Sequence, residues 1–479
     1  MAQAVRAGRR FVPWMVAVGA VTMLAGVLFG YDQGIISGAL TFIQRDFALS
    51  DLMTEVVTSW VTLGALAGAL AAGVLADRIG RRRTNVLAGV LFAAGALLEA
   101  AAPGTGVLVA GRLVIGLGVG MASVAAPLYA AEMAPAASRG RYVSMYQLAI
   151  TVGILVAYVV DDVLSSSGEW RLMLGLAVVP GVALVLGFLV MPETPRWLVG
   201  KGRRTEAEAA LAKVRGGDAD TEASIDAMAA ELAAEPEQAS WREIFGPGLR
   251  RPLLVGLGLA TFQQVTGINA VIYYADDIFG FAGFATPEEQ ARATLYAVGV
   301  VNVLATLIAV AYVDRFGRKP LLQAGLVGMT VSLVAVGGAF AFLDERPPPL
   351  PGGGPPPPST VGIITVIALV VFIASFAFSL GPVVWTVINE IYPGRVRGRM
   401  VAVATAANWG AAFLVSQFFL TLIADVGKAA TFWLFAGLCV VAALWIARYV
   451  PETKGRSLED IQAMWDDEAA RASGPVDRR

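Results

Sequence analysis

The sequence contains no histidine, a single cysteine and few charged residues. The absence of histidine excludes zinc sites built on imidazole and catalysis by a Ser-His or Cys-His pair. With only Cys439, a disulfide within the chain is impossible, and its position in an apolar run predicts a packing role. Charged residues make up 15% of the 479 positions and hydrophobic residues 57%, whereas soluble proteins carry about 25% charge. This composition predicts a membrane protein.

The charge balance and the missing motifs exclude further classes of protein. With a net charge of −1 and no polybasic domain, the chain lacks the electrostatic footprint of a nucleic-acid-binding protein. It has no phosphate-binding Walker loop, so no cycle of phosphate chemistry is implied. No nucleophile–base pair or metal-ligand constellation is visible, which makes a membrane enzyme a remote alternative. We therefore expect neither catalytic nor metal-binding residues.

Apolar runs of about 20 residues, the length of a helix that crosses a bilayer, recur along the chain. They predict an all-α membrane protein with twelve transmembrane helices in two six-helix halves, together with short cytoplasmic helices. The spans are expected at residues 13–41, 54–76, 84–102, 107–131, 142–162, 171–191, 252–279, 291–313, 320–343, 360–391, 400–424 and 429–449.

The distribution of Lys and Arg predicts the orientation. All but six of the 36 lie in the two tails, in the loops that follow the even-numbered spans, or at the span ends next to them. Positive residues accumulate on the cytoplasmic side of a membrane, so both termini are expected to be cytoplasmic in a multi-pass protein of the plasma or inner membrane. The six exceptions are Arg45, Arg112, Arg171, Arg292, Arg346 and Lys428.

Short motifs recur in the two halves and divide the chain. DRIGRRR after the second span is echoed by DRFGRKP after the eighth, and PETPR by PETKG. The loop RPPPLPGGGPPPP at 346–358 must be irregular and solvated, and we assign it no function. The predicted parts are an N-terminal tail (1–12), a first six-helix bundle (13–191), a cytoplasmic linker with short amphipathic helices (192–251), a second bundle (252–450) and a C-terminal tail (451–479).

A polar cluster lies in the seventh span, within a segment at roughly 253–275 that carries no charge. Lipid cannot form hydrogen bonds with the polar side chains of this cluster, so they need protein, water or ligand partners. At about 100° per residue, one straight helix cannot aim all of them at a single point, and we predict a break near Gly267. Convergent amides beside aromatic rings suit an uncharged polyhydroxyl ligand, although amides can also merely hold helices together. The cluster consists of Gln263, Gln264, Asn269 and Tyr273.

Three charged residues lie well inside the predicted spans: Asp32, Glu99 and Arg112. The helical rise places Asp32 in the first span and Arg112 in the fourth, both in the outer half of the membrane, where they can meet. A buried carboxylate tends to take a proton, whereas a nearby Arg favours its ionised form, so the pair can act as a proton switch. The alternative is a static ion pair that only stiffens the first half. Glu99, near an outer end, is expected at the interface.

Further paired charges lie at the cytoplasmic ends of the spans. The positive-inside rule explains the Arg residues but does not require the acidic ones. Such a set can hold the two halves together on the inner side and release them as the halves rock. Its members are Asp77, Arg78, Arg81, Glu132, Arg139, Glu193, Arg196, Asp314, Arg315, Arg318, Glu390, Arg397 and Glu452.

The repeated D-R-x-G-R-[RK] loops resemble the major facilitator superfamily. GYDQGIISGA at 30–39, PETPR, QQVTGIN, GPVVW at 381–385 and PETKG together resemble its sugar porter family, in the family's order and spacing, over about residues 11–460. The resemblance implies a proton-coupled monosaccharide symporter that works by alternating access as a functional monomer. It needs no cofactor, and protons serve as the coupling ion.

The resemblance also assigns residues to the coupling and gating steps. In the proton-linked members, the residues that match Asp32 and Arg112 carry coupling, whereas facilitators commonly have Asn at the aspartate position. The charged set at the cytoplasmic ends would be the gating network of the outward-facing state.

The residues that match the family's sugar ligands come mostly from the second half. Where xylose-type permeases have further Gln residues, this chain has Ile154 and Asn408, as in hexose carriers, which favours glucose or a related hexose. The implied ligands are Gln147, Gln263, Gln264, Asn269, Tyr273, Asn302, Trp385 after a break at Gly381-Pro382, and Asn408, with Phe29 as an aromatic wall.

Two alternatives to a symporter remain open. An uncoupled sugar facilitator would have the same fold, and the acid at Asp32 argues against it. A non-transporting sugar sensor would be expected to carry a long signalling tail, whereas this chain ends about 30 residues after the last predicted span.

Overall fold

The computed structural model describes residues 13–135, 139–215, 221–234, 243–343, 359–392, 396–455, 460–461 and 464–465. Every regular element in these residues is a helix, and twelve helices are long and apolar enough to cross a membrane. The predicted all-α fold with twelve spans is therefore confirmed. The proline- and glycine-rich loop at 346–358 lies outside the described residues.

The first half contains the first six spans. The helices are α1 (Pro13–Phe47), α2 (Asp51–Ile79), α3 (Arg81–Ala100), α4 (Thr105–Met133), α5 (Arg139–Leu164), and α6 (Trp170–Gly175) with α7 (Val178–Val190), which share the sixth span. Glycines allow α2 and α4 to approach closely. A Cβ at Gly116 would lie 2.1 Å from the carbonyl oxygen of Val61, and one at Gly120 would lie 2.1 Å from that of Ala65. Such small-residue contacts are typical of helix packing in membranes.

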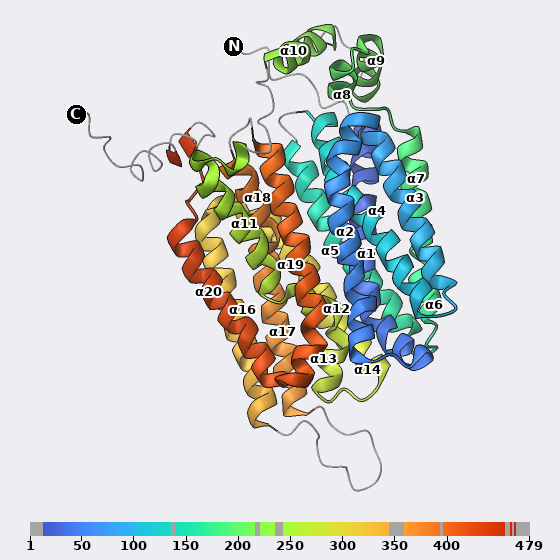
Figure 1. Cartoon of the computed structure of the whole chain (residues 1–479), viewed down its shortest axis with the longest axis vertical. Helices are drawn as coiled ribbons and strands as arrows, with labels where there is room; N and C mark the ends of the chain where they lie inside the picture. Colours follow the sequence, from blue (N-terminus) through green and yellow to red (C-terminus); the bar gives the residue numbers. More distant parts are fainter. Residues whose placement is uncertain are drawn as a thin grey trace, which may run out of the picture.

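The linker contributes three α-helices and two 3-10 turns. They are α8 (Pro195–Gly200), α9 (Arg204–Arg215), α10 (Thr221–Ala234), η1 (Glu243–Phe245) and η2 (Pro247–Leu249). The apolar sides of the first three pack on one another around Leu198, Leu211 and Ile225. Figure 1 shows α8, α9 and α10 together at one end of the molecule, which we call the linker face.

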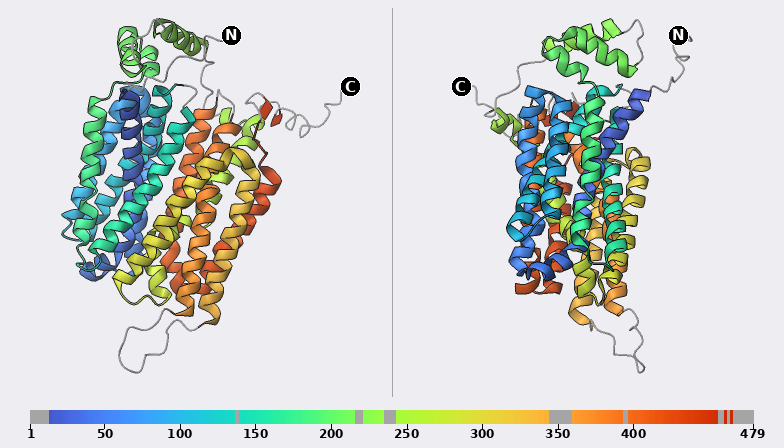
Figure 2. Two further views of the ribbon diagram at one scale, coloured as in Figure 1. Left: turned by 180° about the vertical axis from the view of Figure 1, so that it is seen from behind. Right: turned by 90° about the vertical axis from the view of Figure 1, so that its right-hand side faces the viewer.

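The second half contains the remaining spans, several of which are interrupted. The elements are α11 (Arg250–Val265), α12 (Ile268–Tyr273), α13 (Ala275–Phe281), α14 (Pro287–Thr294), the π-helical turn η3 (Leu295–Val300), α15 (Val301–Phe316), α16 (Arg318–Phe342), α17 (Thr360–Phe378), α18 (Leu380–Ile391), α19 (Arg397–Asp425) and α20 (Lys428–Tyr449). The two halves stand side by side with their helices roughly along one direction (Figures 1 and 2). We call the end opposite the linker face the far face.

Two backbone breaks shape the second half. The predicted break at Gly267 is confirmed, because this residue separates α11 from α12 in a left-handed conformation with φ 97° and ψ 10°. The break predicted at Gly381-Pro382 lies slightly earlier, at Ser379, which has φ −123° and ψ −90°. Pro382 then falls in the first turn of α18, where its missing N–H removes no helical hydrogen bond.

Side chains join the two halves toward the far face. Near the start of α2, the carboxylate of Glu55 accepts hydrogen bonds from the backbone N–H and the hydroxyl of Thr421, at 2.6 and 2.8 Å. One turn further along, the Ser59 hydroxyl donates to Gln417 over 2.7 Å. Ser37 on α1 donates to the buried carboxylate of Asp276 on α13. These contacts join the two halves toward the far face.

Replacing Gly267 with Ala is expected to destabilise the protein. Alanine is strained at a φ of 97°, and its Cβ would lie 3.2 Å from the ring of Phe435. We expect a loss of about 1–2 kcal/mol, seen as a lower melting temperature of the purified protein in detergent. The control is Gly437→Ala, because no atom lies within 4 Å of the Cβ added there. Equal melting temperatures for the two variants would contradict this role of Gly267.

Candidate functional site

Three of the predicted amides converge in the second half. The Asn408 amide nitrogen donates to the side-chain oxygen of Gln263 over 2.8 Å and to the Ala260 carbonyl over 2.9 Å. The Gln264 amide nitrogen donates to the side-chain oxygens of Asn408 and Gln263, at 3.3 and 3.4 Å. The Gln264 Oε1 atom is buried and accepts no hydrogen bond from any residue that the structure describes. The cluster thus contains one buried acceptor with no partner among the described residues.

The break at Ser379 completes this amide cluster. The Gln263 amide nitrogen donates to the carbonyl oxygens of Leu380 and Gly381 over 2.8 and 3.3 Å. The first turn of α18 is therefore held against the end of α11. Trp385, one turn further along α18, is partly buried and packs against the core, so an aromatic ring lies on the same short helix.

The other predicted sugar ligands occupy several different helices. Asn269 and Tyr273 are buried one turn apart on α12, and Asn302 is buried on α15. Gln147 lies partly buried on α5, in the first half. These four have no hydrogen bond to the amide cluster in the described residues, so the structure joins only Gln263, Gln264 and Asn408.

An aromatic contact crosses between the halves beside the cluster. The ring of Phe29 on α1 lies 5.4 Å from that of Trp409 on α19, centroid to centroid. Trp409 directly follows Asn408, so the predicted aromatic wall at Phe29 has a partner that sequence reasoning missed. The apolar run around Trp409 conceals it, and its adjacency to Asn408 was the available signal.

The predicted meeting of Asp32 and Arg112 is confirmed. The Arg112 Nη1 atom lies 2.8 Å from the Asp32 Oδ1 atom, and its Nε atom donates to the Val57 carbonyl over 3.1 Å. The Arg112 side chain is fully buried and that of Asp32 is 4% exposed. Tyr273 on α12, in the second half, is buried and lies near both groups.

The expectation that Glu99 lies at the interface is wrong. Its side chain is 1% exposed, and its Oε1 atom lies 3.7 Å from the Arg112 Nη1 atom. The position near the end of α3 was estimated correctly, but the side chain points inward. A sequence gives the depth of a residue more directly than the direction it faces around the helix, because that direction depends on packing.

On the linker face, the first half contains a connected set of charges. The Arg81 guanidinium lies 3.2 Å from the Asp77 carboxylate and 3.1 Å from that of Glu132. Glu132 also accepts a hydrogen bond from the Thr194 hydroxyl. Glu193 accepts the backbone N–H groups that begin α3, and so stabilises the positive end of this helix.

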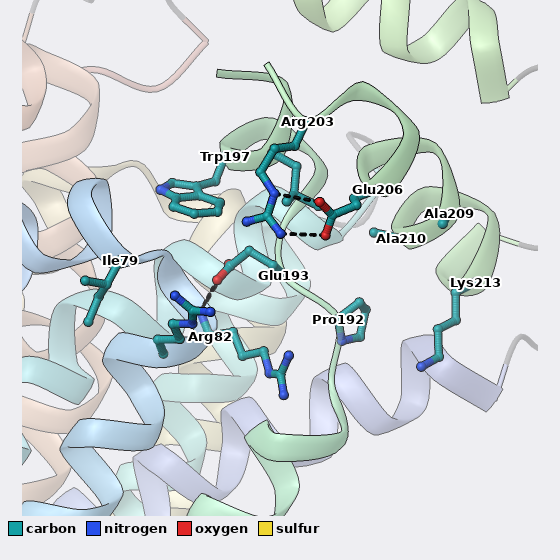
Figure 3. A pocket seen from close by; sticks show the side chains of 12 residues that line it. Ile79, Arg82, Pro192, Glu193, Trp197, Arg203, Glu206, Ala209, Ala210 and Lys213 are labelled. Carbon is teal, nitrogen blue, oxygen red and sulfur yellow. Dashed lines mark hydrogen bonds and ion pairs between the residues drawn. The ribbon is translucent and has the colours of Figure 1, made fainter. Parts of the chain in front are cut away.

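The position of Glu193 also explains why the repeated loop has a glycine at position 80. Gly80 has φ 98°, and a Cβ there would lie 2.1 Å from the Glu193 Oε2 atom. Only glycine lets the carboxylate approach this closely. Figure 3 shows Glu193 beside Arg82 in a pocket on the linker face, where Arg203 pairs with Glu206. Trp197, on the rim of the same pocket, donates its indole N–H to the Asp77 carbonyl.

The second half repeats this arrangement. Arg318 lies 3.1 Å from Glu390, which accepts a hydrogen bond from the Thr453 hydroxyl. Glu452 accepts the backbone N–H groups of Arg318 and Lys319 at the start of α16. Partial burial alone would raise the pKa of Glu452, but hydrogen bonds from backbone N–H groups, including that of Lys454, and the charge of Arg318 lower it overall. Glu452 therefore stays ionised at neutral pH.

Among the described residues, the ion pairs Arg81–Asp77, Arg81–Glu132 and Arg318–Glu390 each join residues of one half. Arg196 pairs with Glu231 on α10 over 3.6 Å, and Arg397 donates to the Tyr392 carbonyl over 3.2 Å. Arg78 is exposed, and the Arg315 carbonyl accepts from Lys454. The side chains of Arg139 and Asp314 lie outside the described residues. A role in holding the two halves together stays a prediction.

Comparisons with known proteins give one consistent result. A family model described as "Sugar (and other) transporter" matches residues 18–465. The chain is 39% identical over 441 residues to the galactose-proton symporter of Escherichia coli (strain K12), covering 92% of each protein. It is also 39% identical over 446 residues to the glucose transporter GlcP of Staphylococcus epidermidis (strain ATCC 12228 / FDA PCI 1200), covering 92% of this chain and 94% of that protein.

A solved structure agrees with these matches. The inward-open conformation of the xylose transporter XylE from E. coli superposes with a TM-score of 0.80 at 30% identity, covering 94% of this chain and 100% of that chain. The matches are to transporters and not to enzymes. The chain is therefore a multi-pass membrane protein that belongs to the sugar porter family of the major facilitator superfamily.

Proposed function

We propose that the protein is a proton-coupled monosaccharide symporter that works by alternating access. The observation that carries this proposal is the buried Asp32–Arg112 ion pair within a sugar porter fold. The protein would act as a monomer in the plasma or inner membrane, with the linker face and both termini in the cytoplasm. Protons would be its coupling ion, and no cofactor would be needed.

The amide cluster is the proposed centre of the sugar site. Gln264 offers a buried acceptor, and Gln263 and Asn408 are held in place by backbone carbonyls on two sides. Neutral amides bond hydroxyl groups, and aromatic rings such as those of Trp385 and Phe29 cover the C–H face of a sugar ring. A glucose-like hexose is proposed, supported by the similarity to transporters named for galactose and glucose.

The conformation supports a specific state in the transport cycle. Glu55, Ser59 and Ser37 hold the halves together at the far face, which would be the outer side in the proposed orientation. The structure would then be inward-facing, in keeping with its similarity to an inward-open transporter. In the outward-facing state, the linker-face charges around Arg81 and Arg318 would instead meet across the halves and act as the inner gate.

An uncoupled sugar facilitator is the second candidate, because it would have the same fold and sugar site. A carboxylate held by a buried guanidinium is costly to maintain, and a facilitator has no use for its titration. A non-transporting sugar sensor shares the fold as well, and the transport assays described next separate it from both.

The orientation can be tested with single cysteines in a Cys439→Ala background. Ser166 is exposed near the far face, between α5 and α6, and Ala223 is exposed on α10. In intact cells, a membrane-impermeant maleimide should label Ser166→Cys and should label Ala223→Cys only after the cells are broken. The reverse pattern would overturn the proposed orientation.

The sugar site can be tested with Gln264→Ala. Loss of one hydrogen bond to a neutral ligand costs about 0.5–1.5 kcal/mol, which raises KM by about 2- to 10-fold. Uptake in proteoliposomes should show this increase while the melting temperature stays close to that of the unmodified protein. Gln323→Ala is the matched control, because among the described residues its amide bonds only the Ala443 carbonyl, toward the linker face. Unchanged KM in Gln263→Ala, Gln264→Ala and Asn269→Ala would place the site elsewhere.

Coupling can be tested with Asp32→Asn. Asparagine has the shape of the protonated acid but cannot release a proton, so counterflow exchange of labelled sugar should persist while accumulation driven by a pH gradient is lost. Asp46→Asn on the same helix removes a half-exposed carboxylate paired with Arg171 and should accumulate sugar normally. If Asp32→Asn still accumulates sugar against its gradient, Asp32 is not the coupling acid. If the unmodified protein does not accumulate sugar in this way, it is a facilitator.

A further inference from the structure

We propose that Glu99 is a second carboxyl of the coupling site, which shares one proton with Asp32 across the guanidinium of Arg112. The inference rests on the proposed proton-coupled function and adds a residue that the motifs do not point to. Glu99 comes from α3, Asp32 from α1 and Arg112 from α4, so three helices of the first half meet at one point.

The geometry places both carboxyl groups on one nitrogen atom. The Arg112 Nη1 atom lies 2.8 Å from Asp32 and 3.7 Å from Glu99. All three side chains are shielded from solvent, with 0%, 4% and 1% exposure for Arg112, Asp32 and Glu99. The position of Glu99 is built into the packing, because a Cβ at Gly111 would lie 2.6 Å from its Cγ atom.

In the described part of the chain, the groups around the site supply no second positive charge. Tyr273 of α12 lies near Asp32 and Arg112, and from α2 the Val57 carbonyl accepts the Arg112 Nε–H group. α7, which packs on α3, carries no ionisable side chain. The nearest described cation from α6 is Arg171, which contacts the Ala102 carbonyl and pairs with Asp46.

One guanidinium cannot balance two buried carboxylates. If both were ionised, the site would hold an uncompensated negative charge among buried side chains, which is strongly unfavourable. One bound proton removes that charge. In the structure, the shorter contact belongs to Asp32, and the Glu99 Oε1 atom has no hydrogen-bond partner among the described residues. This geometry assigns the proton to Glu99 and the ionised state to Asp32.

The position of Glu99 also suits proton entry. It lies in the last turn of α3, at the end that reaches the far face, and the neighbouring Ala101 is exposed. In the proposed orientation this is the outer side. A proton that arrives from outside would meet Glu99 first, and when Asp32 leaves Arg112, the proton moves to Asp32 while Glu99 becomes the ionised partner of the guanidinium. The charge of the three groups together stays unchanged during this exchange.

Removing the second carboxyl should change the pH dependence of uptake and leave sugar exchange intact. In Glu99→Gln, Asp32 no longer has a negative neighbour that favours its protonation, so proton-driven uptake should require a lower external pH. We expect a shift of the uptake profile by about one pH unit or more toward acid. Counterflow exchange, which needs no net proton movement, should keep its KM.

The experiment compares Glu99→Gln, Glu99→Asp and the unmodified protein in the same proteoliposomes. Uptake is measured across external pH, and counterflow at one pH. Glu99→Asp keeps a carboxyl and should stay close to the unmodified profile. Glu169→Gln removes an exposed carboxylate near the same face and serves as the control. An unshifted profile for Glu99→Gln would overturn the role of Glu99 while leaving the symporter proposal standing; an unmodified protein without proton-driven uptake would overturn both.

A second measurement does not depend on Glu99→Gln folding. In the infrared spectrum of the purified protein at neutral pH, the unmodified protein should show the carbonyl band of a protonated carboxyl that Asp32→Asn lacks. The reason is that Glu99 becomes the ionised partner of Arg112 once Asp32 is replaced. If Asp32→Asn retains every protonated-carboxyl band of the unmodified protein, Glu99 does not hold the proton.

Discussion

A lipid bilayer offers no hydrogen-bond partners, and this constraint explains where the chain departs from regular helix. The breaks at Gly267 and Ser379 are both buried within the second half. Gln263, close to the first break, donates to carbonyls at the second, so each irregular segment lies against the other and not against lipid. The amide cluster and the two breaks thus form one unit, and the proposed sugar site lies where the backbone is least regular.

The two halves repeat the same set of hydrogen bonds and ion pairs, which connect helix ends within each half. In each half, an Arg pairs with a Glu that also accepts a Thr hydroxyl, and a second Glu receives the N–H groups that begin a long helix. The first half uses Glu132 and Glu193 in these roles, and the second half uses Glu390 and Glu452. These contacts hold the helix ends of a half in fixed positions. Motion between halves then costs less than distortion within one, which is what rocking of two rigid bodies requires.

The contacts between the halves are of a different kind. They include side-chain hydrogen bonds, such as Ser59 to Gln417, the ion pair of Arg292 with Asp162, and the aromatic pair Phe29 and Trp409. Each of these contacts contributes little free energy and can be replaced by a contact with water or with another partner. By contrast, Arg112 and its carboxylates lie entirely within the first half, with Tyr273 of the second half close by. A change of charge at Arg112 and its carboxylates can therefore act on Tyr273, at the boundary between the two halves.

The sequence by itself determined the twelve spans, because a span must be apolar over about 20 residues wherever it lies in the fold. It also determined the break at Gly267 and the meeting of Asp32 with Arg112, since few polar groups share that depth. Tertiary structure decided which way each side chain faces. It turned Glu99 inward, joined Gln263 and Gln264 to Asn408 but not to Asn269, and kept Arg81 and Glu132 within one half. The physical reason is that hydropathy and helical rise fix depth along the membrane normal, whereas rotation about a helix axis is set only when neighbouring helices pack.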